Sequence, residues 1–115
     1  MVLTEQYADK FQAFSNHTMK ASNDGMLVLD TAWRAEATRI ATDIMALGED
    51  VRQLEPSPDF ELTHSHMLDA ADHYDLAMLY FLTGVDNIDG DMIGVAVDEI
   101  DLGNRCIERA TQALP

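Results

Sequence analysis

Two histidines and a carboxylate lie at helical spacing near the middle of the chain. Asp69 and His73 follow His66 by three and seven residues, so in a helix the three side chains share one face. Imidazole nitrogens and a carboxylate oxygen suit zinc or another divalent ion, with one position left open. Residues seven apart are separated by about 10.5 Å along a helix axis, so a single ion would need a further ligand from another helix. The alternative interpretation is a polar strip that faces solvent.

A second candidate is the single Glu-x-x-His motif, formed by Glu61 and His64. Carboxylate-bridged di-iron bundles use two such motifs together with a Glu from each of two further helices, and only a homodimer of this chain would supply a second copy. His64 also fits two other interpretations. One is a pH-sensitive or pocket-lining residue. The other, which we favour, is a histidine hydrogen-bonded to a backbone carbonyl or a carboxylate beside the turn at Pro56 and Pro58.

Other patterns for catalysis are missing from the sequence. Cys106 is the single cysteine and has no histidine within a helical turn, and the chain contains neither a Gly-rich phosphate loop nor a nucleophile elbow. We therefore expect no enzyme and no cofactor, and keep a metal-dependent enzyme built on the residues above as an alternative.

The composition is strongly acidic. The 115 residues include 21 Asp and Glu but only 7 Lys and Arg, a formal net charge of −14, which argues against direct binding to nucleic-acid phosphates or anionic lipids. No apolar run is long enough to span a membrane. The acidity has three interpretations: a solvated surface, adaptation to a saline habitat, or an acidic surface that occupies a basic, nucleic-acid-binding partner. Candidate partner-binding residues share a narrow helical arc that Arg105 interrupts: Asp91, Asp98, Asp101 and Glu108.

The elements that position these residues are four segments with helical periodicity. We expect helices over about 3–21, 26–54, 58–85 and 90–113. Their apolar residues recur at steps of three and four, which keeps one stripe facing a partner. Ser57 is expected to cap the third helix, with Pro58 in its first turn, and Asn87 or Asp89 the fourth. The expected stripes are Leu3, Tyr7, Phe11, Phe14 and Thr18; Trp33, Ala37, Ile40, Ile44, Leu47, Val51 and Leu54; His64, Met67, Ala71, Tyr74, Met78, Phe81 and Val85; and Ile93, Val97, Ile100, Ile107 and Leu114.

Helices of this length joined by short loops lie antiparallel to their chain neighbours. The sequence therefore predicts an all-α fold, an antiparallel up-down-up-down four-helix bundle forming one domain over 1–115. Between the first two helices we favour a turn at 22–25 over one helix bent near Gly25. Gly94 and Gly103 are expected to allow helix backbones to approach closely.

From Trp33 to Leu114 the chain resembles small all-helical domains of uncharacterised prokaryotic proteins, many of them predicted to be exported or lipid-anchored. The residues that carry the resemblance serve packing and turns: Trp33, Leu54-Glu55-Pro56, His64, Ala70, Ala71, Tyr74, Gly84, Asp86, Gly103 and Ala110–Leu114. The resemblance implies no active site. It implies an extracytoplasmic location if this chain is a mature portion, and a complete chain would be cytoplasmic. Met1-Val2-Leu3-Thr4 lacks the features of a signal peptide.

These observations favour a non-catalytic interaction or structural module that binds a protein partner or self-associates, for example as a homodimer through its first helix. The alternatives are an acidic inhibitor or nucleic-acid mimic that binds a basic partner, and a metal-binding bundle.

Overall fold

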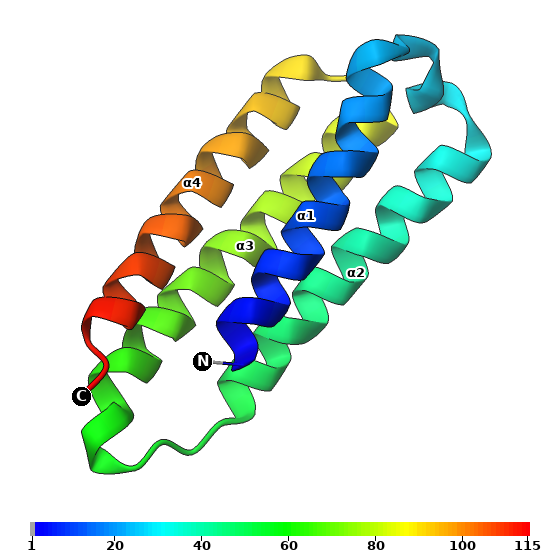
Figure 1. The fold of residues 1–115 in the computed structure, drawn as a ribbon. Coiled ribbons are helices and arrows are strands. Elements are labelled where there is room, and N and C mark those ends of the chain that lie inside the picture. The colour runs from blue at the N-terminus through cyan, green and yellow to red at the C-terminus, as the bar shows by residue number, and fades with distance from the viewer. Residues whose placement is uncertain (1) are drawn as a thin grey trace.

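The computed structural model describes residues 2–115, and the side chains from Thr4 onward. The described chain is an antiparallel up-down-up-down four-helix bundle without strands, which confirms the predicted all-α fold. It is a rod of 49 × 22 × 20 Å with both termini at the end where α2 connects to α3 (Figure 1). Its elements are α1 (Val2–Asn23), the 3-10 helix η1 (Gly25–Leu29), α2 (Thr31–Gln53), the 3-10 helix η2 (Pro58–Phe60), α3 (Glu61–Asn87) and α4 (Gly90–Gln112).

The start of the second helix differs from the prediction. We expected a helix from residue 26, but Gly25–Leu29 form a 3-10 helix and α2 begins at Thr31. The cause is Asp30, whose extended backbone interrupts the helix and whose carboxylate accepts a hydrogen bond from the Trp33 backbone N–H at 2.8 Å. In the sequence, Val28 and Leu29 continue the apolar stripe of the second helix, so the cap at Asp30 was not predicted.

Two further boundaries also differ. The helix expected from residue 58 starts with a 3-10 turn, so α3 begins at Glu61, and Ser57 makes no side-chain cap. At its other end α3 runs past Gly84 to Asn87, and Ile88 ends it in the left-handed conformation with φ 50°. Asp89 then caps α4 by accepting a hydrogen bond from the Met92 backbone N–H. The fourth helix begins at Gly90 as predicted and ends at Gln112, one residue before the predicted end.

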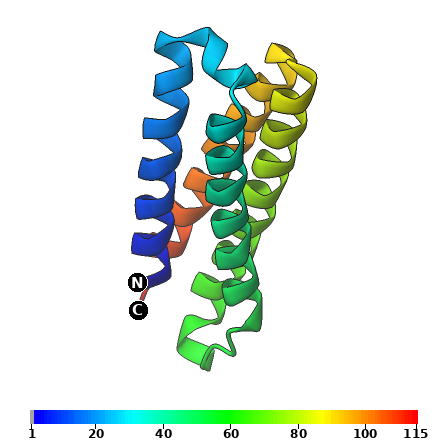
Figure 2. The ribbon, with the colours of Figure 1, turned by 90° about the vertical axis from the view of Figure 1, so that its right-hand side faces the viewer.

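Packing follows the predicted stripes on α2 and α3, where nearly every stripe residue is buried; the exceptions are Leu54, which is 45% exposed, and His64, which is half-buried. In the middle of the bundle, aromatic rings of α1 meet rings of α3. Phe11 and Tyr74 have ring centroids 4.6 Å apart, and Phe14 and Phe81 are 4.7 Å apart. The Leu3 side chain, predicted on the same α1 stripe, lies outside the described residues. Figure 2 shows α1 and α2 side by side along the rod.

We predicted close approach of helix backbones at Gly94 and Gly103, but Gly103 instead makes room for a side chain of α3, and Gly94 faces open space. A Cβ on Gly103 would lie 2.4 Å from a ring carbon of Tyr74, whereas a Cβ on Gly94 would meet nothing within 4 Å. The second close contact is at Gly84, where a Cβ would lie 2.8 Å from Ile93. Gly94 is on the exposed side of α4, so it does not lie at the interface with α3.

Candidate functional site

The predicted metal ligands all lie on α3, but they do not converge. His73 Nδ1 is 2.7 Å from Oε2 of Glu99 on α4. Asp69 is exposed and His66 is half-buried. Among the residues that the structure describes, no three His, Cys, Asp or Glu side chains are close enough together to hold a metal ion. His73 is thus part of a pair that connects α3 to α4, and its partner Glu99 gave no signal in the sequence.

The second candidate motif is also divided. Glu61 is an exposed residue in the first turn of α3. His64 Nε2 lies 2.8 Å from the carbonyl oxygen of Val51; because a carbonyl only accepts, this nitrogen carries the proton and donates. The bond satisfies a carbonyl in the last turn of α2. The structural interpretation of His64 is therefore confirmed.

A buried histidine that the sequence analysis missed lies between α1 and α2. The His17 and Trp33 rings stack with centroids 4.7 Å apart. The indole Nε1–H donates to the His17 carbonyl at 3.1 Å, and His17 Nε2 donates to the Trp33 carbonyl at 2.8 Å. The two residues are 16 positions apart, so no local pattern could reveal this reciprocal pair, which holds the α1–α2 hairpin together.

The nucleophilic and phenolic groups of the interior are poorly suited to chemistry. Burial raises the pKa of the Cys106 thiol, and the nearby Asp69 carboxylate adds to the effect, so the reactive thiolate is disfavoured. Burial also raises the pKa of Tyr7 and of Tyr74 well above the ordinary value. The Tyr74 hydroxyl donates to Asn104 Oδ1 on α4 at 2.6 Å.

An ion-pair cluster around Arg52 connects α2 to α3. Its guanidinium reaches Glu49 on its own helix at 2.9 Å, and Asp72 and Asp75 on α3 at 2.9 and 2.8 Å. Burial raises the pKa of Asp75, and the hydrogen bond from Arg52 opposes that shift. The ion pairs of Arg52 therefore stabilise the packing of α2 on α3.

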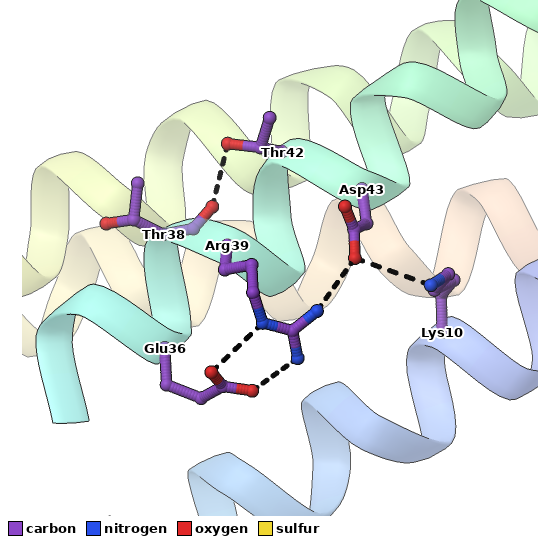
Figure 3. A network of polar contacts seen from close by, with 6 residues as sticks. All are labelled: Lys10, Glu36, Thr38, Arg39, Thr42 and Asp43. Atoms are coloured by element: carbon purple, nitrogen blue, oxygen red, sulfur yellow. Dashed lines mark hydrogen bonds and ion pairs between the residues drawn. The ribbon is translucent and has the colours of Figure 1, made fainter. Parts of the chain in front are cut away.

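Three other basic side chains on α1 and α2 are also engaged. Arg39 binds the carboxylates of Glu36 and Asp43 on its own helix, and Lys10 of α1 reaches the same Asp43 at 3.3 Å (Figure 3). Arg34 of α2 lies 3.7 Å from Asp86. The positive charges of α1 and α2 that form ion pairs are thus bound to carboxylates of α2 and α3.

The outward side of α4 is different. All four predicted partner-binding residues are exposed there, namely Asp91, Asp98, Asp101 and Glu108. Among the described residues, no Lys or Arg forms an ion pair with a carboxylate of α4. Asp98 and Asp101 line a shallow hollow together with Leu102 and Arg105, so a positive charge lies within the acidic arc.

An apolar strip borders this acidic arc. Val95 and Leu102 are 43% and 38% exposed, and they lie one turn to either side of Glu99 on α4. The Glu99–His73 contact crosses the outer seam between α3 and α4. Because the two helices are antiparallel, Leu76 and Tyr80, which follow His73, lie on the same side of that contact as Val95, and both are exposed. The seam thus combines exposed apolar side chains with carboxylates.

No helix among the described residues is both long enough and apolar enough to cross a bilayer. Comparison with known proteins found no match to this chain among family models, curated proteins or solved structures.

Proposed function

We propose that this chain is a non-catalytic interaction module that binds a positively charged segment of another protein along α4. The observation that carries the proposal is the outward side of α4, where exposed carboxylates that form no ion pair with a described Lys or Arg border the exposed Val95 and Leu102. An amphipathic helix rich in Lys would complement both parts of this surface.

Two features favour such a partner over the alternatives. A second copy of the chain would bring another net charge of −14 against the first, which opposes self-association through this face. Arg105 shares the hollow with Asp98 and Asp101, which fits a protein segment of mixed contacts better than imitation of an unbroken row of phosphates. The buried thiol of Cys106 and the hydrogen-bonded rings of His64 and His73 support a role without catalysis.

The test uses three synthetic helical peptides of equal length: one of Leu and Lys with amphipathic spacing, one with Glu in place of Lys, and one with Ser in place of Leu. Binding is measured by isothermal titration calorimetry at low and high salt. We expect the Leu/Lys peptide to bind best and to weaken steeply as salt rises. The triple variant Asp91→Asn/Asp98→Asn/Asp101→Asn should weaken that binding by about tenfold.

A matched variant separates the α4 surface from net charge alone. Asp9→Asn/Asp50→Asn/Asp59→Asn removes the same number of exposed carboxylates from other elements, and it should weaken binding by less than about threefold. Val95→Thr should lower the affinity for the Leu/Lys peptide and leave the Ser/Lys peptide unaffected. Equal losses in both triple variants, or no binding of the Leu/Lys peptide, would refute the proposal.

A further inference from the structure

The exposed side of α4 changes charge along its length. Two rows of exposed residues run along it, one of Asp91, Asp98 and Arg105 and one of Val95, Leu102 and Arg109. Within each row the residues are seven positions apart, a spacing that keeps them nearly in line along a helix. The two rows are therefore acidic and apolar over 91–102 and basic near the C-terminal end of α4.

Neither Arg105 nor Arg109 forms an ion pair with a described carboxylate. Asp101 precedes Arg105 by four residues, a spacing at which ion pairs often form on a helix. Glu108 is adjacent to Arg109, but neighbouring residues of a helix point about 100° apart. The arginines of α2, by contrast, all bind carboxylates: Arg34, Arg39 and Arg52. Within the described part of the chain, both guanidinium groups of α4 thus retain donors for a carboxylate of a partner.

The helix dipole accounts for only one of these arginines. Basic side chains are favoured in the last turn of a helix, and Arg109 lies in the last turn of α4. Arg105 lies seven residues before Gln112, where α4 ends, and at about two turns from the end this effect is small. Arg105 instead lines a hollow of about 220 Å³ together with Asp98 and Leu102. The hollow thus lies where the charge of the first row changes sign.

We propose that the helical partner carries basic residues along the part that faces Asp91 and Asp98, and acidic residues at the end that faces Arg105 and Arg109. This inference rests on the proposed function, because it assigns the charge pattern of the same partner. Two carboxylates one turn apart on the partner would match the two arginines, which are four residues apart. A helix docked in the opposite direction would bring like charges together at both ends. The two arginines therefore determine the direction in which the partner lies along α4.

The test uses two helical peptides with the same Leu positions and the same numbers of Lys and Glu. In the block peptide, Lys occupies about three turns of the charged face and Glu the remaining two or so, whereas in the mixed peptide Lys and Glu alternate along that face. Isothermal titration calorimetry at low salt should show the block peptide binding about three- to tenfold more tightly. For Arg105→Gln/Arg109→Gln this difference should fall below about twofold, because the Glu residues lose their partners.

A nitroxide label at the Glu-rich end of the block peptide reports its direction on the protein. In the ¹⁵N-labelled protein, the label should broaden the amide signals around Arg109 and leave those around Asp91 sharp. The control variant Lys20→Gln/Arg39→Gln removes two exposed basic side chains from α1 and α2. It changes the net charge by the same amount and should retain the wild-type preference for the block peptide.

Three results would overturn this inference. They are equal affinities of the block and mixed peptides for the wild type, a preference that survives in Arg105→Gln/Arg109→Gln, and broadening around Asp91 in place of Arg109. Each of them leaves the proposed function intact as long as the Leu/Lys peptide binds. Failure of every peptide to bind would overturn the inference and the proposed function together.

Discussion

The tight contact at Gly103 allows a sharp test of the bundle. Replacing a helical glycine with alanine normally stabilises a protein by roughly 0.5–1 kcal/mol, because alanine loses less backbone entropy on folding. At Gly103 the added Cβ would lie 2.4, 2.7 and 3.0 Å from three ring carbons of Tyr74. We therefore expect Gly103→Ala to destabilise the protein.

The magnitude follows from how firmly Tyr74 is held. Its hydroxyl donates to Asn104 at 2.6 Å, and its ring lies 4.9 and 4.6 Å from the rings of Tyr7 and Phe11. Because the ring cannot move aside freely, the upper part of the range for overpacking applies, about 3 kcal/mol. After the gain in helix propensity is subtracted, the net loss is about 2 kcal/mol.

Gly94→Ala is the matched control, since it places the same change on the same helix where a Cβ meets nothing within 4 Å. It should stabilise by about 0.5–1 kcal/mol. Thermal unfolding followed by circular dichroism should show a Tm about 8 °C lower for Gly103→Ala and about 3 °C higher for Gly94→Ala. In a Tyr74→Leu background the loss caused by Gly103→Ala should largely disappear. A Gly103→Ala protein as stable as the wild type would refute the close packing of α3 on α4.

Two further predictions concern ion pairing and backbone strain. Arg52→Met should lower the free energy of unfolding by about 1–2 kcal/mol at pH 7, a value reduced for the partial exposure of the cluster. Burial holds the pKa of Asp75 above its ordinary value of 3.8, and the loss of Arg52 raises this pKa further. The variant therefore gains stability as the pH falls and Asp75 takes up a proton. Urea unfolding should show a smaller loss of stability at pH 4.5 than at pH 7, and equal losses would contradict this account. Ile88→Gly should stabilise by about 1 kcal/mol because a β-branched residue is strained at φ 50°; an unchanged midpoint in urea would show that the exposed Ile88 side chain compensates for the strain.

Much of the fold could be predicted from local patterns. The steps of three and four from Trp33 to Val51 and from Met67 to Val85 correspond to buried stripes, because a helix places such residues on one face whatever its neighbours are. The error at the start of the second helix arose where two local signals competed. At Asp30 a capping side chain prevailed over an apolar pattern that continued through Val28 and Leu29.

The interactions between helices were much harder to predict. Glu99 pairs with His73, and His17 with Trp33, and both pairings depend on how far one helix is shifted and rotated against the other. That relation is set by packing across the whole interface rather than by spacing along the chain.

The order of the helices has a consequence for how this chain acquires its structure. The extensive interfaces join α1 to α2, α2 to α3 and α3 to α4, so every step of assembly brings together segments that are already adjacent along the polypeptide. Topologies with such low contact order fold rapidly, within about milliseconds. The α3–α4 hairpin has the most extensive interface, so we expect it to form first. Because α1 packs less extensively on its neighbours than α3 packs on α4, we expect it to dock last and to be the first helix released when the native state opens.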